Sequence, residues 1–164
     1  MMRIITLLIF ALIGCFSAVG QYQIIDSIAN RIDILCEPGS SVKGYVIQNL
    51  SDSDTTRLNT IYYIDSLSCQ FFKTIYDCTF NGEEKIDFYY NNKELIKAKL
   101  SHFKEGEFYH ESFYFQNDSL IHRTGTSPPP AFVKWTEKEI DKQAAEYLQD
   151  SFSICNYIRK KSNK

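Results

Sequence analysis

The chain has 164 residues, of which 18 are Lys or Arg and 20 are Asp or Glu, so its net charge is −2. With 44% hydrophobic residues, this balance excludes a disordered acidic tail and disfavours a nucleic-acid binder, which would be strongly basic. The length suits one compact domain, and an aromatic content of 15% favours a sheet-rich fold.

The first 20 residues differ from the rest of the chain. Arg3 is their only charge, residues 4–13 are almost all apolar, and small residues lead up to Gly20. This order predicts a signal peptide over residues 1–20, which leaves a single domain at 21–164. Alternatively, the segment from Leu12 to Cys15 resembles the bacterial lipobox, in which the cysteine carries a lipid. Both interpretations predict an exported protein, either periplasmic or secreted, and the second predicts an outer-membrane lipoprotein anchored through Cys15.

A helical pattern follows the leader. From Gln21 to Cys36 apolar residues recur at spacings of three and four, and Pro38-Gly39 then ends the pattern. A short strand is predicted from Gly44 to Gln48, before a polar loop at residues 51–56.

Residues 57–124 are predicted to form an antiparallel meander. Three segments in it share a run of aromatic residues, a polar turn and an aliphatic pair, and their tyrosines are 26 and 25 positions apart: Tyr63, Tyr89 and Tyr114. The composition predicts two-residue turns at Asn92-Lys93, Glu105-Gly106 and Asn117-Asp118.

The last part of the chain is predicted to be helical. Residues 127–130, Ser-Pro-Pro-Pro, end the meander, and Thr136 with Glu139 then forms a capping-box signature. Apolar residues trace one helical face from Ile140 to Ile158. Because neither helix can bury its stripe alone, we expect an α+β fold: an antiparallel β-meander sheet with an N-terminal and a long C-terminal helix packed on one face.

Four cysteines follow the leader, and an even number permits two disulfides in an exported chain: Cys36, Cys69, Cys78 and Cys155. Cys36 and Cys155 lie on the apolar stripes of the two predicted helices, which makes a Cys36–Cys155 bridge a candidate. Two buried thiols are the alternative. The sequence has no Cys-x-x-Cys or His-x-x-x-His spacing, so we predict neither a metal site nor a cofactor.

The predicted turns assign a strand register, and the register assigns side chains to faces. It pairs Tyr89 with Ile96, Ala98 with Phe113, and Phe115 with Leu120. The face opposite the helices then carries the candidate binding residues Phe88, Tyr90, Lys97, Lys99, His110, Tyr114 and Arg123. Aromatic and basic side chains together favour recognition of a partner, although such residues also form simple cross-strand pairs on solvated sheets.

No catalytic constellation is recognisable in the sequence. His102, His110 and His122 do not converge in this register, and neither Gly-x-Ser-x-Gly nor a phosphate-binding loop occurs. Rather than an enzyme, we expect an exported bacterial cell-envelope protein that binds another protein through the open face, for example as an inhibitor or immunity-type protein. The alternatives are a small secreted hydrolase with an unrecognised site and a structural, self-associating envelope component. No nucleic acid is expected as a partner, and membrane contact only through a lipid anchor.

Overall fold

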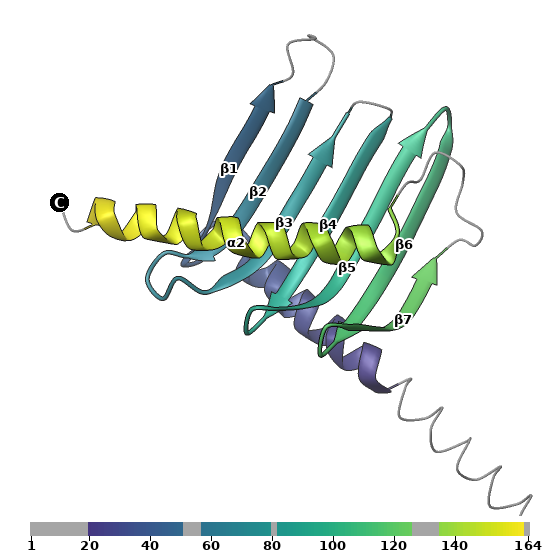
Figure 1. The fold of residues 1–164 in the computed structure, drawn as a ribbon, viewed down its shortest axis with the longest axis horizontal. Coiled ribbons are helices and arrows are strands. Elements are labelled where there is room, and N and C mark those ends of the chain that lie inside the picture. Colours follow the sequence, from purple (N-terminus) through teal and green to yellow (C-terminus); the bar gives the residue numbers. More distant parts are fainter. Residues whose placement is uncertain (1–19, 51–56, 80–81, 126–134, 163–164) are drawn as a thin grey trace, which may run out of the picture.

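The computed structural model describes residues 20–50, 57–79, 82–125 and 135–162. In this part of the chain, seven strands form one open antiparallel sheet in chain order (Figure 1). The strands are β1 (Val42–Leu50), β2 (Arg57–Asp65), β3 (Phe71–Cys78), β4 (Glu83–Asn91), β5 (Glu94–Lys104), β6 (Glu107–Gln116) and β7 (Ser119–Gly125). A helix at residues 20–35 precedes the sheet, and α2 (Glu137–Ser162) follows it. The predicted α+β meander with a helix at each end is therefore confirmed.

Several sequence predictions concern segments outside the described residues. These are residues 1–19 of the leader with its lipobox-like Cys15, the polar loop at 51–56 and the proline run. Neither described helix is long and apolar enough to cross a membrane.

The three predicted hairpin turns are confirmed. In each turn, both central residues have positive φ: Asn92 and Lys93, Glu105 and Gly106, and Asn117 and Asp118. Positive φ at both positions is the backbone of the type I′ turn, whose twist matches that of the strands it joins. The predicted capping box also forms, because the Thr136 hydroxyl accepts from the Glu139 N–H and the Glu139 carboxylate accepts from the Thr136 N–H.

The weak sequence repeat corresponds to a repeated β-bulge. The strand register shifts directly after Tyr63, Tyr89 and Tyr114. At each shift the neighbouring strand contains one residue with no directly opposite partner: Phe72, Ile96 and Ile121. A bulge of this kind transfers the side chains beyond it to the other face of their strand.

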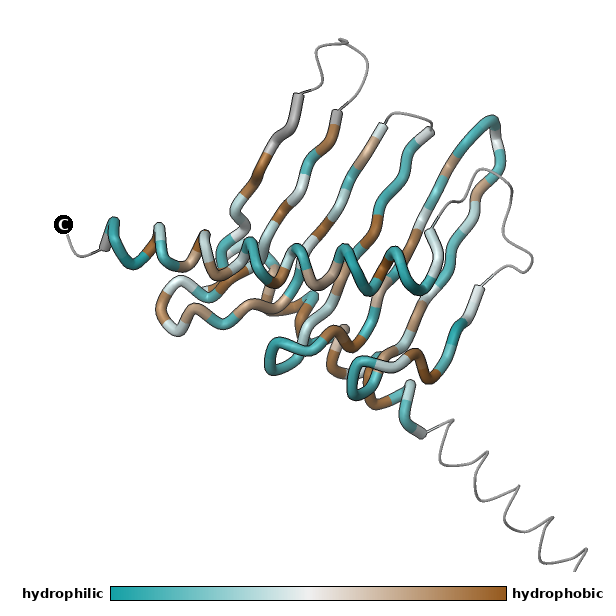
Figure 2. The backbone as a smooth tube through the Cα atoms, viewed as in Figure 1, coloured by the Kyte–Doolittle hydropathy of each residue, from teal (hydrophilic) through white to brown (hydrophobic). Residues whose placement is uncertain are grey.

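The two helices cover opposite faces of the sheet (Figure 1). Ile140, Ala144 and Tyr147 of α2 pack on a cluster that includes Phe88 and Tyr90. On the reverse face, Ile25, Ala29 and Ile32 of the N-terminal helix pack on a separate cluster with Tyr89, Ile96 and Tyr114. Figure 2 shows hydrophobic and hydrophilic positions mixed along the strands.

The prediction that both helices pack on one face is therefore wrong. A register drawn from the turns alone pairs Tyr89 with Ile96, whereas the bulge leaves Ile96 unpaired and places Tyr89 opposite Lys97. The predicted pairs of Ala98 with Phe113 and Phe115 with Leu120 are correct. Phe88 and Tyr90 consequently lie on the face that α2 covers.

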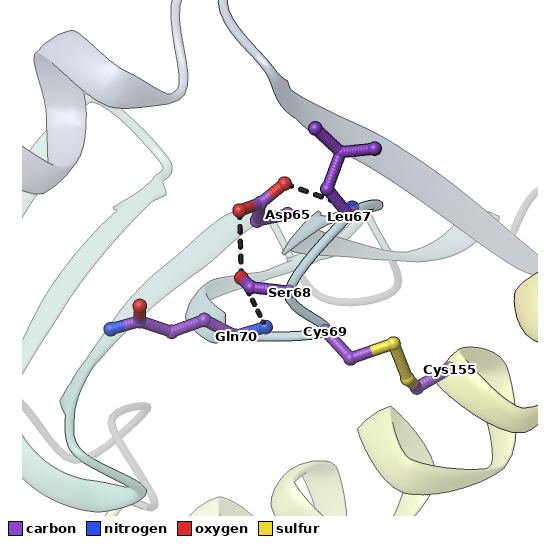
Figure 3. The surroundings of a disulfide bond; sticks show 6 residues. All are labelled: Asp65, Leu67, Ser68, Cys69, Gln70 and Cys155. Atoms are coloured by element: carbon purple, nitrogen blue, oxygen red, sulfur yellow. Dashed lines mark hydrogen bonds between the residues drawn. A yellow bond between two sulfur atoms is a disulfide. The ribbon is translucent and has the colours of Figure 1, made fainter.

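The predicted Cys36–Cys155 disulfide is also wrong, because the sheet separates the two helices that carry these residues. The structure instead joins Cys69 to Cys155, with their Cα atoms 5.8 Å apart (Figure 3). Among the described residues, Cys36 and Cys78 are free thiols. Cys69 lies in the loop between β2 and β3, where the Asp65 carboxylate accepts hydrogen bonds from the Leu67 N–H and the Ser68 hydroxyl. The disulfide therefore fastens α2 to an ordered loop.

Candidate functional site

The structure separates the seven residues predicted to form one binding face. Phe88 and Tyr90 are buried beneath α2. Tyr114 and Lys97 lie on the reverse face, in contact with the N-terminal helix. Lys99 and His110 share that reverse face but remain exposed, and Arg123 lies on the α2 face and binds Glu111. A binding surface made of all seven residues therefore does not exist.

A row of alternating tyrosine and lysine residues crosses the sheet on the reverse face. The cross-strand pairs connect them in one line across β2 to β7: Tyr63, Lys73, Tyr89, Lys97, Tyr114 and His122. We call these six residues the Tyr–Lys row. Each of its tyrosines immediately precedes a bulge, so the repeat seen in the sequence produces both the bulges and the row.

The N-terminal helix attaches to the Tyr–Lys row through two equivalent carboxylates. Asp33 accepts from Lys73 Nζ at 2.7 Å through one oxygen and from the Tyr89 hydroxyl at 3.1 Å through the other. Asp26 accepts in the same way from Lys97 Nζ at 2.6 Å and from the Tyr114 hydroxyl at 3.3 Å. Tyr22, one turn earlier on the helix, stacks on the His122 ring with the centroids 4.4 Å apart.

The spacing of these carboxylates matches the spacing of the strands. Asp33 follows Asp26 by seven positions along the helix, which is a rise of about 10.5 Å. Their lysine partners lie on β5 and β3, two strand spacings or about 9.6 Å apart. Two helical turns therefore advance the helix by two strands, and each carboxylate meets an equivalent Lys–Tyr pair.

The carboxylates around Lys73 keep the lysine charged, and burial keeps the nearby Cys36 thiol protonated. Burial favours a lower pKa for Lys73, but the carboxylates of Asp87 and Asp33 outweigh this effect and raise the pKa. For the neighbouring Cys36 thiol, burial has the opposite effect and raises the pKa to about 12. Cys36 is therefore neutral at physiological pH, which does not suit a nucleophile. The cluster is a salt-bridged attachment for the helix rather than a reactive site.

A second polar cluster lies on the α2 face. The buried Glu111 carboxylate accepts from the Tyr109 hydroxyl at 2.5 Å and from Arg123 through Nη2 at 2.9 Å, with a further contact from Nε. Nearby, His102 Nδ1 lies 3.1 Å from Glu84 Oε2. Since Glu111 is held by two donor groups, its geometry is that of a structural ion pair. Within the described ranges, no group of His, Cys, Asp and Glu residues could hold a metal ion.

Part of the reverse face extends beyond the N-terminal helix. On β4 to β6 this part carries a compact set of side chains that we call the outer patch: Lys85, Lys99, Phe103, Phe108 and His110. Phe103 and Phe108 lie directly opposite each other on neighbouring strands and are 44% and 63% exposed. The Phe108 and His110 rings stack at 5.9 Å.

Sequence reasoning found only Lys99 and His110 of the outer patch. The two phenylalanines could have been found, because the Glu105-Gly106 turn between them fixes their pairing. Their exposure could not be predicted, because it depends on how far the N-terminal helix extends over the reverse face. The contacts of Asp26 and Asp33 with the Tyr–Lys row were not predicted, because the sequence pattern predicted the N-terminal helix on the same face as the C-terminal helix.

Comparison of the chain with protein-family models, with curated proteins and with solved structures finds no match. A function can therefore be inferred only from the chain's own geometry.

Proposed function

We propose that the protein is an exported, non-catalytic binding module of the bacterial cell envelope, and that it holds a partner protein on the outer patch. The observation that carries this proposal is the Phe103–Phe108 pair, which presents two adjacent aromatic rings to solvent. Large apolar side chains that are exposed together favour burial against a partner, and aromatic residues are frequent anchors of protein interfaces.

The strands that carry the outer patch are held rigidly, which favours binding of a partner. On the other side of β5 and β6, Leu100, His102 and Tyr109 alternate with the patch residues and are buried, which fixes the two strands. A patch on such a rigid sheet loses little conformational freedom when it binds. This makes the patch a preorganised surface.

The side chains around the aromatic pair indicate the chemistry of the partner. His110 is exposed next to Phe108, Lys99 lies four positions from Phe103 on β5, and Lys85 lies one strand further on, beside the exposed Glu83 that pairs with Phe103. Basic groups beside an apolar anchor favour a protein surface with apolar side chains at its centre and acidic ones at its rim. An inhibitor or immunity-type protein that binds a secreted enzyme or toxin is one form of such a module.

Two observations support export. The first 20 residues have the composition of a secretory leader. In addition, Cys69 and Cys155 form a disulfide, a linkage that persists in oxidising compartments and is rare in the cytosol.

Site-specific photocrosslinking tests the proposal. A photoreactive residue replaces Phe108 in the purified protein, which is then exposed to the envelope fraction of its host. We expect one adduct that unlabelled protein competes away and that Lys99→Glu weakens without changing the melting temperature. The matched control carries the photoreactive residue at the exposed Phe152 on α2. Equal labelling at both positions, or no competed adduct at position 108, would refute binding through the outer patch.

A further inference from the structure

β1 forms one free edge of the sheet. Its nine residues pair with β2 in unbroken register, without the bulges that interrupt β2–β3, β4–β5 and β6–β7. Among the described residues no strand pairs with the other side of β1. A long, regular edge of this kind presents a row of backbone donors and acceptors to solvent, which is a template for another strand.

β1 also lacks the features that usually protect an edge. Lys43 is its only charged residue, and it contains no proline. Val46 and Ile47 point to opposite faces of the strand and are 56% and 40% exposed. The opposite edge differs, because β7 is shorter, contains a bulge and engages Arg123 and His122 in contacts with the rest of the chain.

We propose that β1 pairs antiparallel with β1 of a second copy, so that the two sheets become one continuous sheet. Val46 is the middle residue of β1 and lies opposite the partner's Val46, a register that uses all nine positions. Tyr45 then lies opposite the partner's Ile47 on the α2 face, and the two Lys43 residues stand near opposite ends of the pairing. The strand is therefore apolar and self-complementary at the centre of the interface.

The end of α2 suits the same arrangement. The Tyr90 hydroxyl on β4 donates to the Ala144 carbonyl, and the Tyr62 hydroxyl on β2 donates to Asp150. Six residues, about 9 Å of helix, therefore span about two strand spacings, so α2 reaches β1 near residue 153. Its last turns project past β1 (Figure 1) and carry the exposed Tyr157. In the two-fold dimer these turns extend over the first strands of the second copy.

The mass of the purified protein in solution tests the pairing. We expect sedimentation velocity to show a particle of twice the chain mass, and Val46→Lys with Ile47→Lys to reduce it to the chain mass at an unchanged melting temperature. The matched control introduces two lysines at the exposed Ile24 and Ile34 of the N-terminal helix and should keep the dimer. A monomeric wild-type protein at all soluble concentrations, or a dimer that survives the β1 substitutions, would overturn the proposal.

A cysteine substitution tests the register. Val46→Cys should give a disulfide-linked dimer under mild oxidation, because residues opposite each other in an antiparallel pair approach within the reach of a disulfide. Ile24→Cys should give none. A dimeric sample of the Val46→Cys variant that does not cross-link would show that the proposed register is wrong. These outcomes are independent of the adduct expected at Phe108.

Discussion

Asp33 and Lys73 meet at 2.7 Å across the interface between the N-terminal helix and the sheet, and they are unequally buried. The Lys73 side chain is 8% exposed, whereas that of Asp33 is 46% exposed. Lys73 also lies 3.0 Å from the largely buried Asp87. The same lysine therefore compensates one carboxylate inside the protein and holds another at its surface.

Substitutions of Lys73 and Asp33 should consequently lower the free energy of unfolding by different amounts. We expect Lys73→Met to lower the free energy of unfolding by about 3 kcal/mol, because it leaves the Asp87 carboxylate buried without its closest cation. Asp33→Asn should cost only about 1 kcal/mol, since this carboxylate is half exposed to solvent. Urea unfolding of the oxidised protein measures both, with the exposed Lys138→Met as a control. Equal losses for the two variants would contradict this account.

Reduction of the Cys69–Cys155 disulfide should destabilise the fold. The bond closes a loop of 86 residues, for which chain entropy predicts a contribution of about 4 to 5 kcal/mol. We expect Cys69→Ser and Cys155→Ser each to lower the urea midpoint, and the double variant to lower it no further than either single variant. Cys36→Ser is the matched control, because this thiol is free. Mapping of a disulfide-linked peptide pair other than 69 with 155 would disprove the assignment.

We expect the protein to lose stability at a lower alkaline pH than repulsion among its charges alone would cause. Burial raises the pKa of the tyrosines at 62, 76, 89, 90 and 147 above the ordinary value. Because the folded-state pKa exceeds the unfolded-state pKa, their contribution to stability is complete below about pH 10 and is lost as the pH rises toward the folded-state values. The pKa of Lys73 is raised as well and acts in the same direction.

The measurement is urea unfolding as a function of pH, together with the near-ultraviolet absorbance of tyrosinate. We expect the free energy of unfolding to fall above about pH 10, and the buried tyrosines to ionise only as the chain unfolds. Tyr147→Phe should make the fall less steep, since one of these hydroxyls is then missing. Complete ionisation of the tyrosines near pH 10 in a folded chain would contradict the expectation.

The turn between β5 and β6 offers a stabilising substitution. Glu105 has φ of 53°, a backbone conformation that asparagine tolerates better than glutamate. Glu105→Asn should raise the free energy of unfolding by about 0.5 to 1 kcal/mol, because it creates the Asn-Gly pair preferred in type I′ turns. Gly106→Ala should lower it by about 1 kcal/mol, since alanine at φ of 84° is strained even though no atom crowds its added methyl group. A thermal melt of each variant shows whether the two changes have opposite signs.

Local patterns predicted the elements of this fold correctly. The turns at Asn92, Glu105 and Asn117 and the cap at Thr136 depend on residues only a few positions apart, and all four formed as expected. The side of the sheet on which each helix packs is a different kind of property. It depends on the number of bulges between two turns, and a bulge adds one residue without a distinctive composition.

One signal in the sequence did indicate that both faces are covered. Residues 86–90 form an almost continuous apolar run, and all five are buried. Unbroken apolar strands are typical of sheets that are buried on both sides, whereas a half-solvated sheet shows alternation. The same reasoning applies to Phe113, Tyr114 and Phe115, which are buried on alternating sides. The wrong prediction of Cys36 as the disulfide partner of Cys155 followed from this error, because Cys36 lies at the end of the N-terminal helix, on the face opposite α2.

Because the rise of the N-terminal helix matches the spacing of the strands, the length of this helix is linked to the width of the sheet. If duplication added another bulged hairpin to this sheet, a new Lys–Tyr pair would face water unless the N-terminal helix also grew by seven residues that include an aspartate. Loss of a hairpin would equally leave Asp26 or Asp33 without its lysine. Changes in strand number are thus tied to heptad-sized changes in the helix, which restricts how insertions and deletions can accumulate in this architecture.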